Sequence, residues 1–298
     1  MKQLILLGTV LFYTSKNLSA QGYLLRGFSD TIVVMLKKVY NGKKYENNRK
    51  YTFTYDKYGC LLSKLEEQWS DEWTNVFLET NTIDKNHVVT EELSQYWAGS
   101  SWENKYQYSK KWTYNKKGQR SSGTRKDFRK GAWENSWETT NTFNNFGKIE
   151  IELIQNYEPE GLINDELNTY TYDADGFLIS KVHQRWHTSK NVWVNRQQDL
   201  YVNDKTGKIT SHTTQQWNNE VWENESRLTL AYDAQSNLIS ETKEDWEDKW
   251  ENSRKTIITY EKGNRPKKME EKSWDGKAWK SSSQTTFSYQ KRELVKTK

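Results

Sequence analysis

Residues that could carry catalysis or hold a metal ion are sparse in this 298-residue sequence. Among the four histidines, only His183 and His187 lie close together, four positions apart. On a strand this spacing places both imidazoles on one face but roughly 13 Å apart, which is too far for a single ion. On a helix the same spacing would suit zinc. Because the sequence around them alternates as a strand does, we predict no metal site here.

Acidic and thiol side chains give no stronger signal. Asp173 and Asp175 imitate the first positions of a calcium-binding loop, but the glutamate that closes such a loop is missing. Cys60 is the only cysteine, and no base that could activate its thiol lies near it in the sequence. Neighbouring acids such as Glu66 and Glu67 would point to opposite faces of a strand. We therefore predict no enzymatic activity, no bound metal and no cofactor.

The composition differs from that of a conventional globule. Apolar residue types make up 34% of the chain, whereas ordinary domains contain about 45–50%. The apolar residues are unusually aromatic, with 15 tryptophans, 18 tyrosines and 9 phenylalanines. Disordered chains contain few aromatic residues, so we expect a folded chain that relies on aromatic side chains. The formal net charge is only +5, without a basic tract, which gives no indication of nucleic-acid binding.

The aromatic residues follow a repeat of about 29 residues. They recur as pairs whose second members lie 28 to 31 residues apart, and an asparagine usually follows the second member after two residues. Thirteen of the 15 tryptophans belong to the pairs, and only Trp112 and Trp137 do not. The pairs are Tyr40/Tyr45, Trp69/Trp73, Trp97/Trp102, Phe128/Trp133, Tyr157/Leu162, Trp186/Trp193, Trp217/Trp222, Trp246/Trp250 and Trp274/Trp279.

Each unit predicts two strands and two turns. Residues 172–176 place an Asp three positions before a Gly, which is typical of a type I turn followed by a left-handed residue. The second turn lies between the paired aromatics and has the length of a short hairpin loop. The predicted fold class is all-β, an antiparallel β-meander of about nine two-stranded repeats of about 29 residues each. We expect an open twisted sheet, or a β-solenoid or superhelix.

The aromatic rows fit two roles. Strand alternation predicts that Trp250, Asn252 and Tyr260 share one face. The indoles either stack from unit to unit and replace an aliphatic core, or remain exposed and bind sugar rings, with neighbouring amides on the hydroxyls. Side-chain exposure distinguishes the two roles. In the second, the ligand-binding residues are Trp69, Trp73, Trp97, Trp102, Trp186, Trp193, Trp217, Trp222, Trp246 and Trp250.

The first residues have the features of a secretory signal peptide. Lys2 precedes an apolar run, and a small-residue cleavage site ends at Ala20. We expect a secreted or cell-surface protein, and the periplasm also fits. The predicted organisation is a signal peptide at 1–20 and a single β-repeat domain at 21–298, with a capping unit at about 27–55, repeats at about 56–289 and a basic tail at 290–298.

The Tyr-Asp-x-x-Gly turn, present at residues 55–59 and 172–176, resembles the repeat of the YD-repeat (Rhs-type) proteins. The longer unit, with its Trp-Glu-Asn block, is more similar to secreted β-repeat proteins of Bacteroidetes type. The resemblance implies spiralling antiparallel sheets that form shells or extended surfaces, often beside a toxin or adhesin module.

These observations predict a non-enzymatic structural or binding surface at the cell exterior, with a glycan or a surface protein as partner. The alternatives are a glycan-binding module that uses exposed tryptophan rows and a Rhs-type shell segment associated with a toxin system. A hydrolase would need a cluster that breaks the repeat, and the most irregular segment, 155–164, holds only Glu158 and Glu160. A membrane-spanning barrel is not expected, because Arg254 and Lys255 charge both faces of one strand.

Overall fold

The computed structural model describes residues 31–85, 88–261 and 264–290. The predicted signal peptide at 1–20, all but the first residue of the predicted tail at 290–298, and His87 lie outside the described residues. Within the described part of the chain, no helix has the length and hydropathy of a membrane span. Eighteen strands account for most of this part of the chain.

The strands follow one another at short intervals, as the repeat predicted. In chain order they are β1 (Thr31–Tyr40), β2 (Tyr45–Tyr55), β3 (Leu61–Ser70), β4 (Glu72–Ile83), β5 (Val89–Trp97), β6 (Trp102–Tyr114), β7 (Arg120–Arg129), β8 (Ala132–Phe143), β9 (Ile149–Glu158), β10 (Gly161–Tyr172), β11 (Leu178–His187), β12 (Val192–Asn203), β13 (Ile209–Asn218), β14 (Val221–Tyr232), β15 (Leu238–Glu247), β16 (Lys249–Glu261), β17 (Arg265–Trp274) and β18 (Trp279–Gln290).

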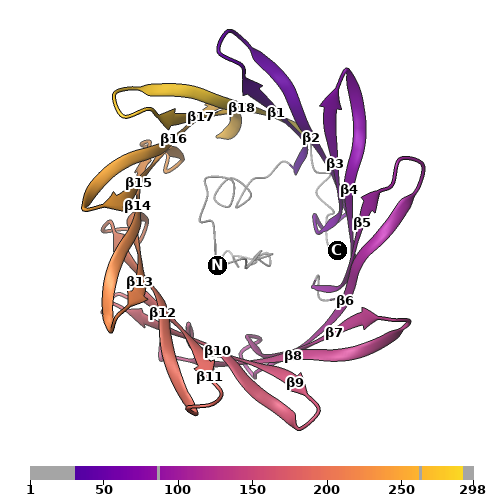
Figure 1. Cartoon of the computed structure of the whole chain (residues 1–298), viewed down its shortest axis with the longest axis vertical. Coiled ribbons are helices and arrows are strands. Elements are labelled where there is room, and N and C mark those ends of the chain that lie inside the picture. The colour runs from indigo at the N-terminus through magenta and orange to yellow at the C-terminus, as the bar shows by residue number, and fades with distance from the viewer. Residues whose placement is uncertain (1–30, 86–87, 262–263, 291–298) are drawn as a thin grey trace, which may run out of the picture.

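The sheet closes into a barrel. Each strand pairs in antiparallel fashion with its chain neighbours, and β1 also pairs with β18, from Thr31 opposite Gln290 to Val39 opposite Ser283. The all-β prediction is correct, but the predicted open sheet or solenoid is wrong. Closure pairs the backbone groups that an open sheet would leave free along its first and last strands. The predicted capping unit at about 27–55, as far as it is described (31–55), therefore has a neighbour on both sides (Figure 1).

A β-bulge interrupts every hairpin that carries an aromatic pair. In β15 and β16, Asn252 lies opposite Glu244 and Arg254 lies opposite Lys243, so Ser253 has no partner across the ladder. The same one-residue shift recurs three residues after each second aromatic. The bulged residues are Asn48, Val76, Lys105, Ser136, Asp165, Arg196, Glu225, Ser253 and Ser282.

The bulge changes which residues share a face. An extra residue in one strand reverses the alternation of the side chains that follow it. Trp250 and Asn252 therefore lie on one face, and Tyr260 lies on the other. The prediction that all three share a face is wrong for this reason. We call the face with the aromatic pairs the outer face and the opposite one the inner face.

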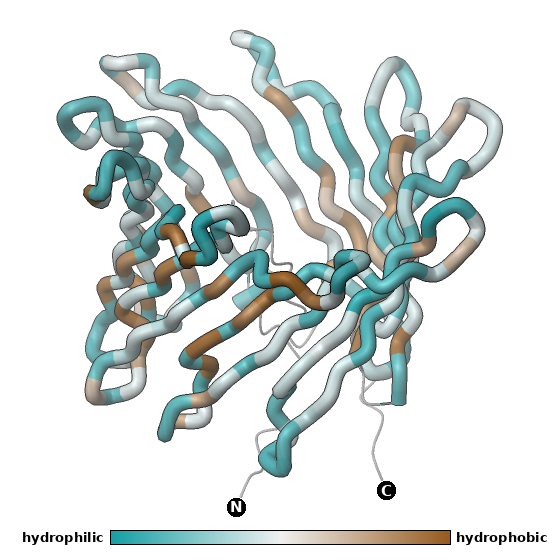
Figure 2. The backbone as a smooth tube through the Cα atoms, turned by 60° about the horizontal axis from the view of Figure 1, so that its bottom comes forward, coloured by the Kyte–Doolittle hydropathy of each residue, from teal (hydrophilic) through white to brown (hydrophobic). Residues whose placement is uncertain are grey.

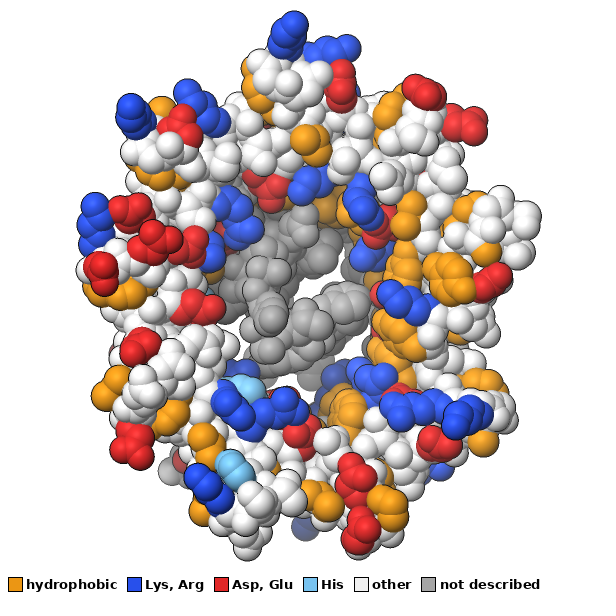
Figure 3. Space-filling view, in the orientation of Figure 1, with side chains coloured by type: hydrophobic (Ala, Val, Ile, Leu, Met, Phe, Trp, Pro, Cys, Tyr) orange, Lys and Arg blue, Asp and Glu red, His pale blue; other side chains and the backbone are white. Residues whose placement is uncertain are grey.

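The inner face is the concave side of the barrel. Every strand residue that is buried lies on it, including Tyr170, Asp199, Glu241 and Met269. Side chains converge on the concave side of a closed sheet, so burial is expected there. Figure 3 shows Lys, Arg, Asp and Glu side chains around the central opening of the ring. A barrel of this strand number is in the size range of proteins that enclose a water-filled channel.

Tyrosines at the ends of the even-numbered strands fix the rim opposite the aromatic pairs. The hydroxyl of Tyr172 donates a hydrogen bond to the carbonyl of Ile149 at 2.7 Å, and Tyr260 donates to Leu238 at 2.8 Å. Burial raises the pKa of Tyr260 to about 12, so this hydroxyl keeps its proton. At the end of β12 the corresponding residue is Asn203 and not a tyrosine. Its amide nevertheless donates the equivalent hydrogen bond to the carbonyl of Leu178 at 2.8 Å.

Candidate functional site

The paired aromatics stand opposite each other at the hairpin tips. Trp186 faces Trp193 across β11 and β12, with ring centroids 5.0 Å apart and planes at 65°. Eight of the nine pairs have two rings, with centroids 4.8 to 5.3 Å apart. Seven of these pairs are edge-to-face and Tyr40/Tyr45 is tilted, and edge-to-face contacts are a preferred geometry of aromatic pairs. The tips flare outward around the ring in Figure 1, so the structure gathers the predicted site residues along one rim.

The tip indoles are not a buried core. None of the ten tryptophans predicted to bind ligand is buried, and Trp246 is 38% exposed. Their aromatic ring contacts are with their own hairpin partners, so the predicted stacking of indoles from unit to unit does not occur among the described residues. In some places a basic side chain from the preceding hairpin lies over a tip indole instead. The guanidinium of Arg227 lies 4.7 Å from the ring of Trp250, and Lys50 Nζ lies 5.2 Å from that of Trp73.

Amide pairs lie just below the tips on the outer face. Gln184 Nε2 donates to Asn195 Oδ1 at 2.8 Å, and Gln215 donates to Asn224 at 2.9 Å. Each asparagine stands immediately before a bulged residue. In four hairpins the recurring asparagine, which the sequence suggested as a hydroxyl-binding group, therefore has a hydrogen bond within its own hairpin.

The aspartates of the turns accept hydrogen bonds from backbone N–H groups of the same turns. Asp173 Oδ1 accepts hydrogen bonds from the backbone N–H groups of Asp175 and Phe177, at 3.0 and 2.7 Å. The calcium-loop resemblance of this segment is explained by turn geometry. In residues 31–85, 88–261 and 264–290, no group of three His, Cys, Asp or Glu residues is placed to hold a metal ion.

Two histidines lie on the inner wall beside acids. His183 Nε2 lies 3.6 Å from Glu166, and His212 Nε2 lies 2.9 Å from Asp199 Oδ1. Burial opposes ionisation of Asp199, but hydrogen bonds from His212 and its neighbours outweigh it and hold the pKa of Asp199 below its usual value. The pairing of neighbouring strands brings each histidine close to its acid. Sequence analysis could not identify these pairs, because the two members lie far apart in the chain.

An acid–tyrosine group occupies the inner wall at β4 to β6. Glu92 accepts hydrogen bonds from the hydroxyls of Tyr106, at 3.1 Å, and Tyr108. Glu79 lies nearby and is only 6% exposed, and its Oε1 has no hydrogen-bond partner. Burial and the charge of Glu92 raise the pKa of Glu79, against an opposing effect of Lys64. The residues of this group lie in ordinary repeat positions, so sequence analysis missed them.

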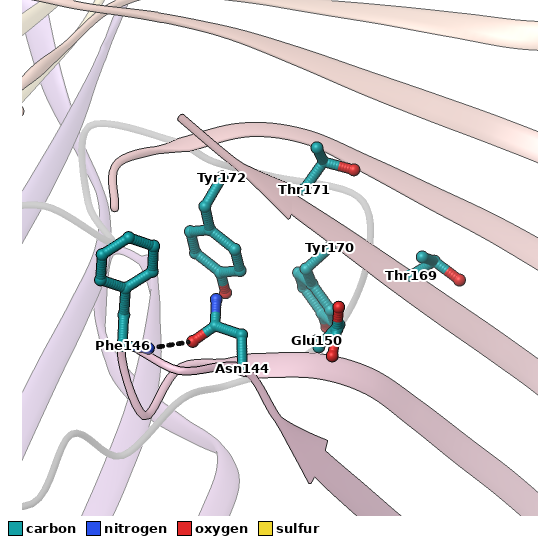
Figure 4. A pocket seen from close by; sticks show the side chains of 7 residues that line it. All are labelled: Asn144, Phe146, Glu150, Thr169, Tyr170, Thr171 and Tyr172. Atoms are coloured by element: carbon teal, nitrogen blue, oxygen red, sulfur yellow. Dashed lines mark hydrogen bonds between the residues drawn. The ribbon is translucent and has the colours of Figure 1, made fainter. Parts of the chain in front are cut away.

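A shallow pocket of about 260 Å³ lies at the turn rim, between the turn after β8 and the end of β10. Its walls include Asn144, Phe146, Glu150, Tyr170 and Tyr172 (Figure 4). Asn144 Oδ1 accepts the backbone N–H of Phe146 at 3.0 Å, and the Tyr172 hydroxyl is bonded to a backbone carbonyl. Both of these polar atoms are therefore already hydrogen-bonded to backbone groups.

No protein-family model matches this chain, and no curated protein matches it. A porin-like protein from Bacteroides uniformis is 13% identical over 88% of this chain and 98% of that one, with a TM-score of 0.41. A porin-like protein from Bacteroides vulgatus is 9% identical over 87% and 99%, with a TM-score of 0.31. A TcdB2–TccC3–Cdc42 structure is 13% identical over 82% of this chain and 15% of that one, with a TM-score of 0.30. All three TM-scores lie below 0.5, so the YD-repeat resemblance remains a prediction.

Proposed function

We propose that this chain is an exported, non-catalytic binding protein whose ring of aromatic hairpin tips contacts a glycan at the cell exterior. The observation that carries the proposal is the recurrence of edge-to-face aromatic pairs, none of them buried, along one rim of a closed barrel. An indole held edge-on by its partner keeps a face available for the C–H groups of a sugar ring. Repetition around the rim would raise the affinity for a polymer through avidity.

The outer wall supports a water-facing location for this ring. Near the end of each even-numbered strand, one residue on the outer face is exposed, and most of these residues bear a hydroxyl group. They are Thr54, Thr82, Thr113, Thr142, Thr171, Val202, Ala231, Thr259 and Ser288. Outer-face ion pairs join Lys50 to Glu67 and Arg227 to Glu244, each at 2.8 Å. A basic residue facing lipid at mid-membrane depth costs about 2–4 kcal/mol. Figure 2, which colours the residues of both faces, shows the hydrophobic ones in short stretches along the strands.

Glycan-array screening of the full chain, followed by calorimetry with the best polysaccharide, tests the proposal. The double variant Trp186→Ala/Trp193→Ala removes the indole pair of one hairpin tip, and Trp217→Ala/Trp222→Ala removes the pair of the next tip. We expect affinity for the polysaccharide to fall stepwise as tips are removed, while the circular dichroism spectrum is unchanged.

The hairpin of β9 and β10 provides the matched control, because its pair is Tyr157 and Leu162. Leu162→Ala removes an apolar side chain from a tip without removing an indole and should leave affinity unchanged. Binding that survives the loss of four tip indoles would rule the aromatic ring out as the binding surface.

A further inference from the structure

The two tryptophans that do not belong to the aromatic pairs lie on the same part of the inner wall, one strand apart. Trp112 lies on β6 and Trp137 on β8, and β7 runs between them. Register places Trp112 opposite Gly123 and Trp137 opposite Arg125, two positions further along β7. Three neighbouring strands therefore depart from the repeat at the same place, which indicates a local role rather than a general one in the barrel.

Gly123 makes room for one of these indoles. A Cβ atom at this position would lie 2.5 Å from Trp112 Cε3 and 2.6 Å from its Cζ3, so the indole lies directly on the backbone of β7. Its φ is not in the left-handed region, so space and not backbone conformation requires the glycine. The equivalent position carries a side chain in the other eight units: Met35, Lys64, Glu92, Glu152, Lys181, His212, Glu241 and Met269.

Basic side chains surround the two indoles. Lys110 Nζ lies 4.6 Å from the ring of Tyr108 and 6.0 Å from that of Trp137. The guanidinium of Arg120 lies 4.9 Å from the ring of Trp112. Within the described part of the chain, neither Lys110 nor Arg120 forms an ion pair with a carboxylate.

The charges around Lys110 are mostly basic. Burial and the adjacent charges of Arg125 and Arg120 lower the pKa of Lys110, against an opposing effect of Glu92. Arg125 itself is paired, because its Nε lies 2.6 Å from Asp127 Oδ1. Lys110 and Arg120 are therefore the two cations at this place that an incoming anion would neutralise.

Unused hydrogen-bonding atoms lie on the next strand. Thr139 stands directly opposite Gly123 and is only 3% exposed, and its hydroxyl has no hydrogen-bond partner. Asn141 donates its amide to the Arg120 carbonyl at 3.0 Å, but its Oδ1 has no partner and the residue is 8% exposed. A buried polar atom without a partner costs stability, and a hydroxylated ligand reaching this wall would supply partners.

We infer that Lys110, Trp112, Arg120 and Trp137 form an inner-wall site for a short acidic saccharide. The indoles supply the stacking surface that a sugar ring requires, and the two cations supply charge-assisted hydrogen bonds to a carboxylate. A simple inorganic anion would not need the indoles. A long polyanion does not fit, because Glu92 on β5 and Glu152 on β9 flank the site on the same inner face. The site is separate from the tip ring and does not depend on it.

Calorimetry of the full chain with digalacturonic acid tests this inference. The dimethyl ester of the same disaccharide, which lacks the charge, and inorganic phosphate, which lacks the ring, are the comparison ligands. We expect the diacid to bind and each comparison ligand to bind at least about tenfold more weakly. Equal binding of the neutral ester or of phosphate would overturn the assignment, as would no binding of the diacid.

Matched variants locate the site. Lys110→Gln should weaken binding of the diacid about tenfold, whereas Lys111→Gln, which removes the same charge from the outer face, should change it less than about twofold. Gly123→Ala should also weaken binding, because its Cβ displaces the Trp112 indole. Trp137→Phe keeps an aromatic ring in the wall and provides a second test if Gly123→Ala does not fold.

Two results would contradict the location of the site. The first is equal weakening by Lys110→Gln and Lys111→Gln, which would indicate binding by overall charge. The second is loss of diacid binding in Trp186→Ala/Trp193→Ala, which would place the ligand at the tips. Since that tip variant leaves the inner wall intact, the two proposals fail separately.

Discussion

His212 Nε2 lies 2.9 Å from Asp199 Oδ1 on the inner wall, where β12 and β13 pair. The imidazole also stacks on Tyr201, with centroids 4.8 Å apart and planes at 7°. Asp199 accepts further hydrogen bonds from Thr214, at 3.0 Å, and from Gln197. A buried carboxylate is tolerated when it is hydrogen-bonded in this way, and these hydrogen bonds favour the ionised form of Asp199 in the folded barrel.

His212→Phe should destabilise the barrel in a pH-dependent manner. The ring retains its stacking but loses its hydrogen bond, so we expect the free energy of unfolding to fall by about 1–3 kcal/mol at pH 7. Because the folded pKa of Asp199 is depressed, its stabilisation is present above the ordinary value of 3.8 and is lost as pH falls through the folded pKa. Denaturant titrations of both proteins should therefore converge in acid. His187→Phe, at an exposed tip, is the control, and a difference that stays constant with pH would contradict the account.

Glu79→Gln should stabilise the protein at neutral pH. The folded pKa of Glu79 is raised, so its favourable contribution is present below the ordinary value of 4.5 and is lost as pH rises through the folded pKa. The amide removes the buried charge, and we expect a gain on the order of 1 kcal/mol at pH 7 that shrinks toward pH 4. Thermal melts at both pH values measure it. Glu91→Gln, on the outer face of the same sheet, should show no such gain, and a loss of stability in Glu79→Gln at pH 7 would refute the prediction.

Ser236→Gly should raise the melting temperature. Ser236 has a φ of 74°, in the left-handed region, at a turn position where Gly176 and Gly207 have φ of 79° and 81°. A residue with a Cβ pays about 1–2 kcal/mol for this conformation, partly offset by the greater freedom of glycine in the unfolded chain. Ser236→Ala retains the strain and should not be stabilised. Equal melting temperatures for both variants would show that strain at this turn is unimportant.

Deletion of Ser253 should prevent correct folding of the hairpin of β15 and β16. Without the bulged residue, either Trp250 or Tyr260 must move to the wrong face of the sheet. We expect loss of cooperative unfolding, measured by circular dichroism, while Ser253→Ala unfolds as the parent does. A deletion variant with parental stability would show that the bulge does not set the faces.

The repeat and the number of hairpins could be predicted because they depend on local features. Turn residues such as Asp173 and Gly176, and the spacing of paired indoles, specify each hairpin without reference to the rest of the chain. Closure could not be predicted, because it depends on Val39 meeting Ser283 across nearly the whole sequence.

The bulges escaped sequence analysis for a different reason. The nine bulged residues that follow the second aromatics include Val76, Lys105 and Ser253, which share no chemical property. Their common feature is their place in the strand register, so Tyr260, which follows a bulge, was assigned to the wrong face. Trp112 and Trp137 were recognised as exceptions to the repeat, but only the pairing of β6, β7 and β8 places them on the same part of the inner wall.

The pairing of β1 with β18 also governs how such a protein can change size. A rod made of hairpins can gain or lose one at its end while all others keep their positions. A ring cannot, because inserting one hairpin adds two strands to the circumference and widens the opening for every unit at once. Any change in repeat number during evolution or engineering would therefore alter the bore of the whole molecule in discrete steps.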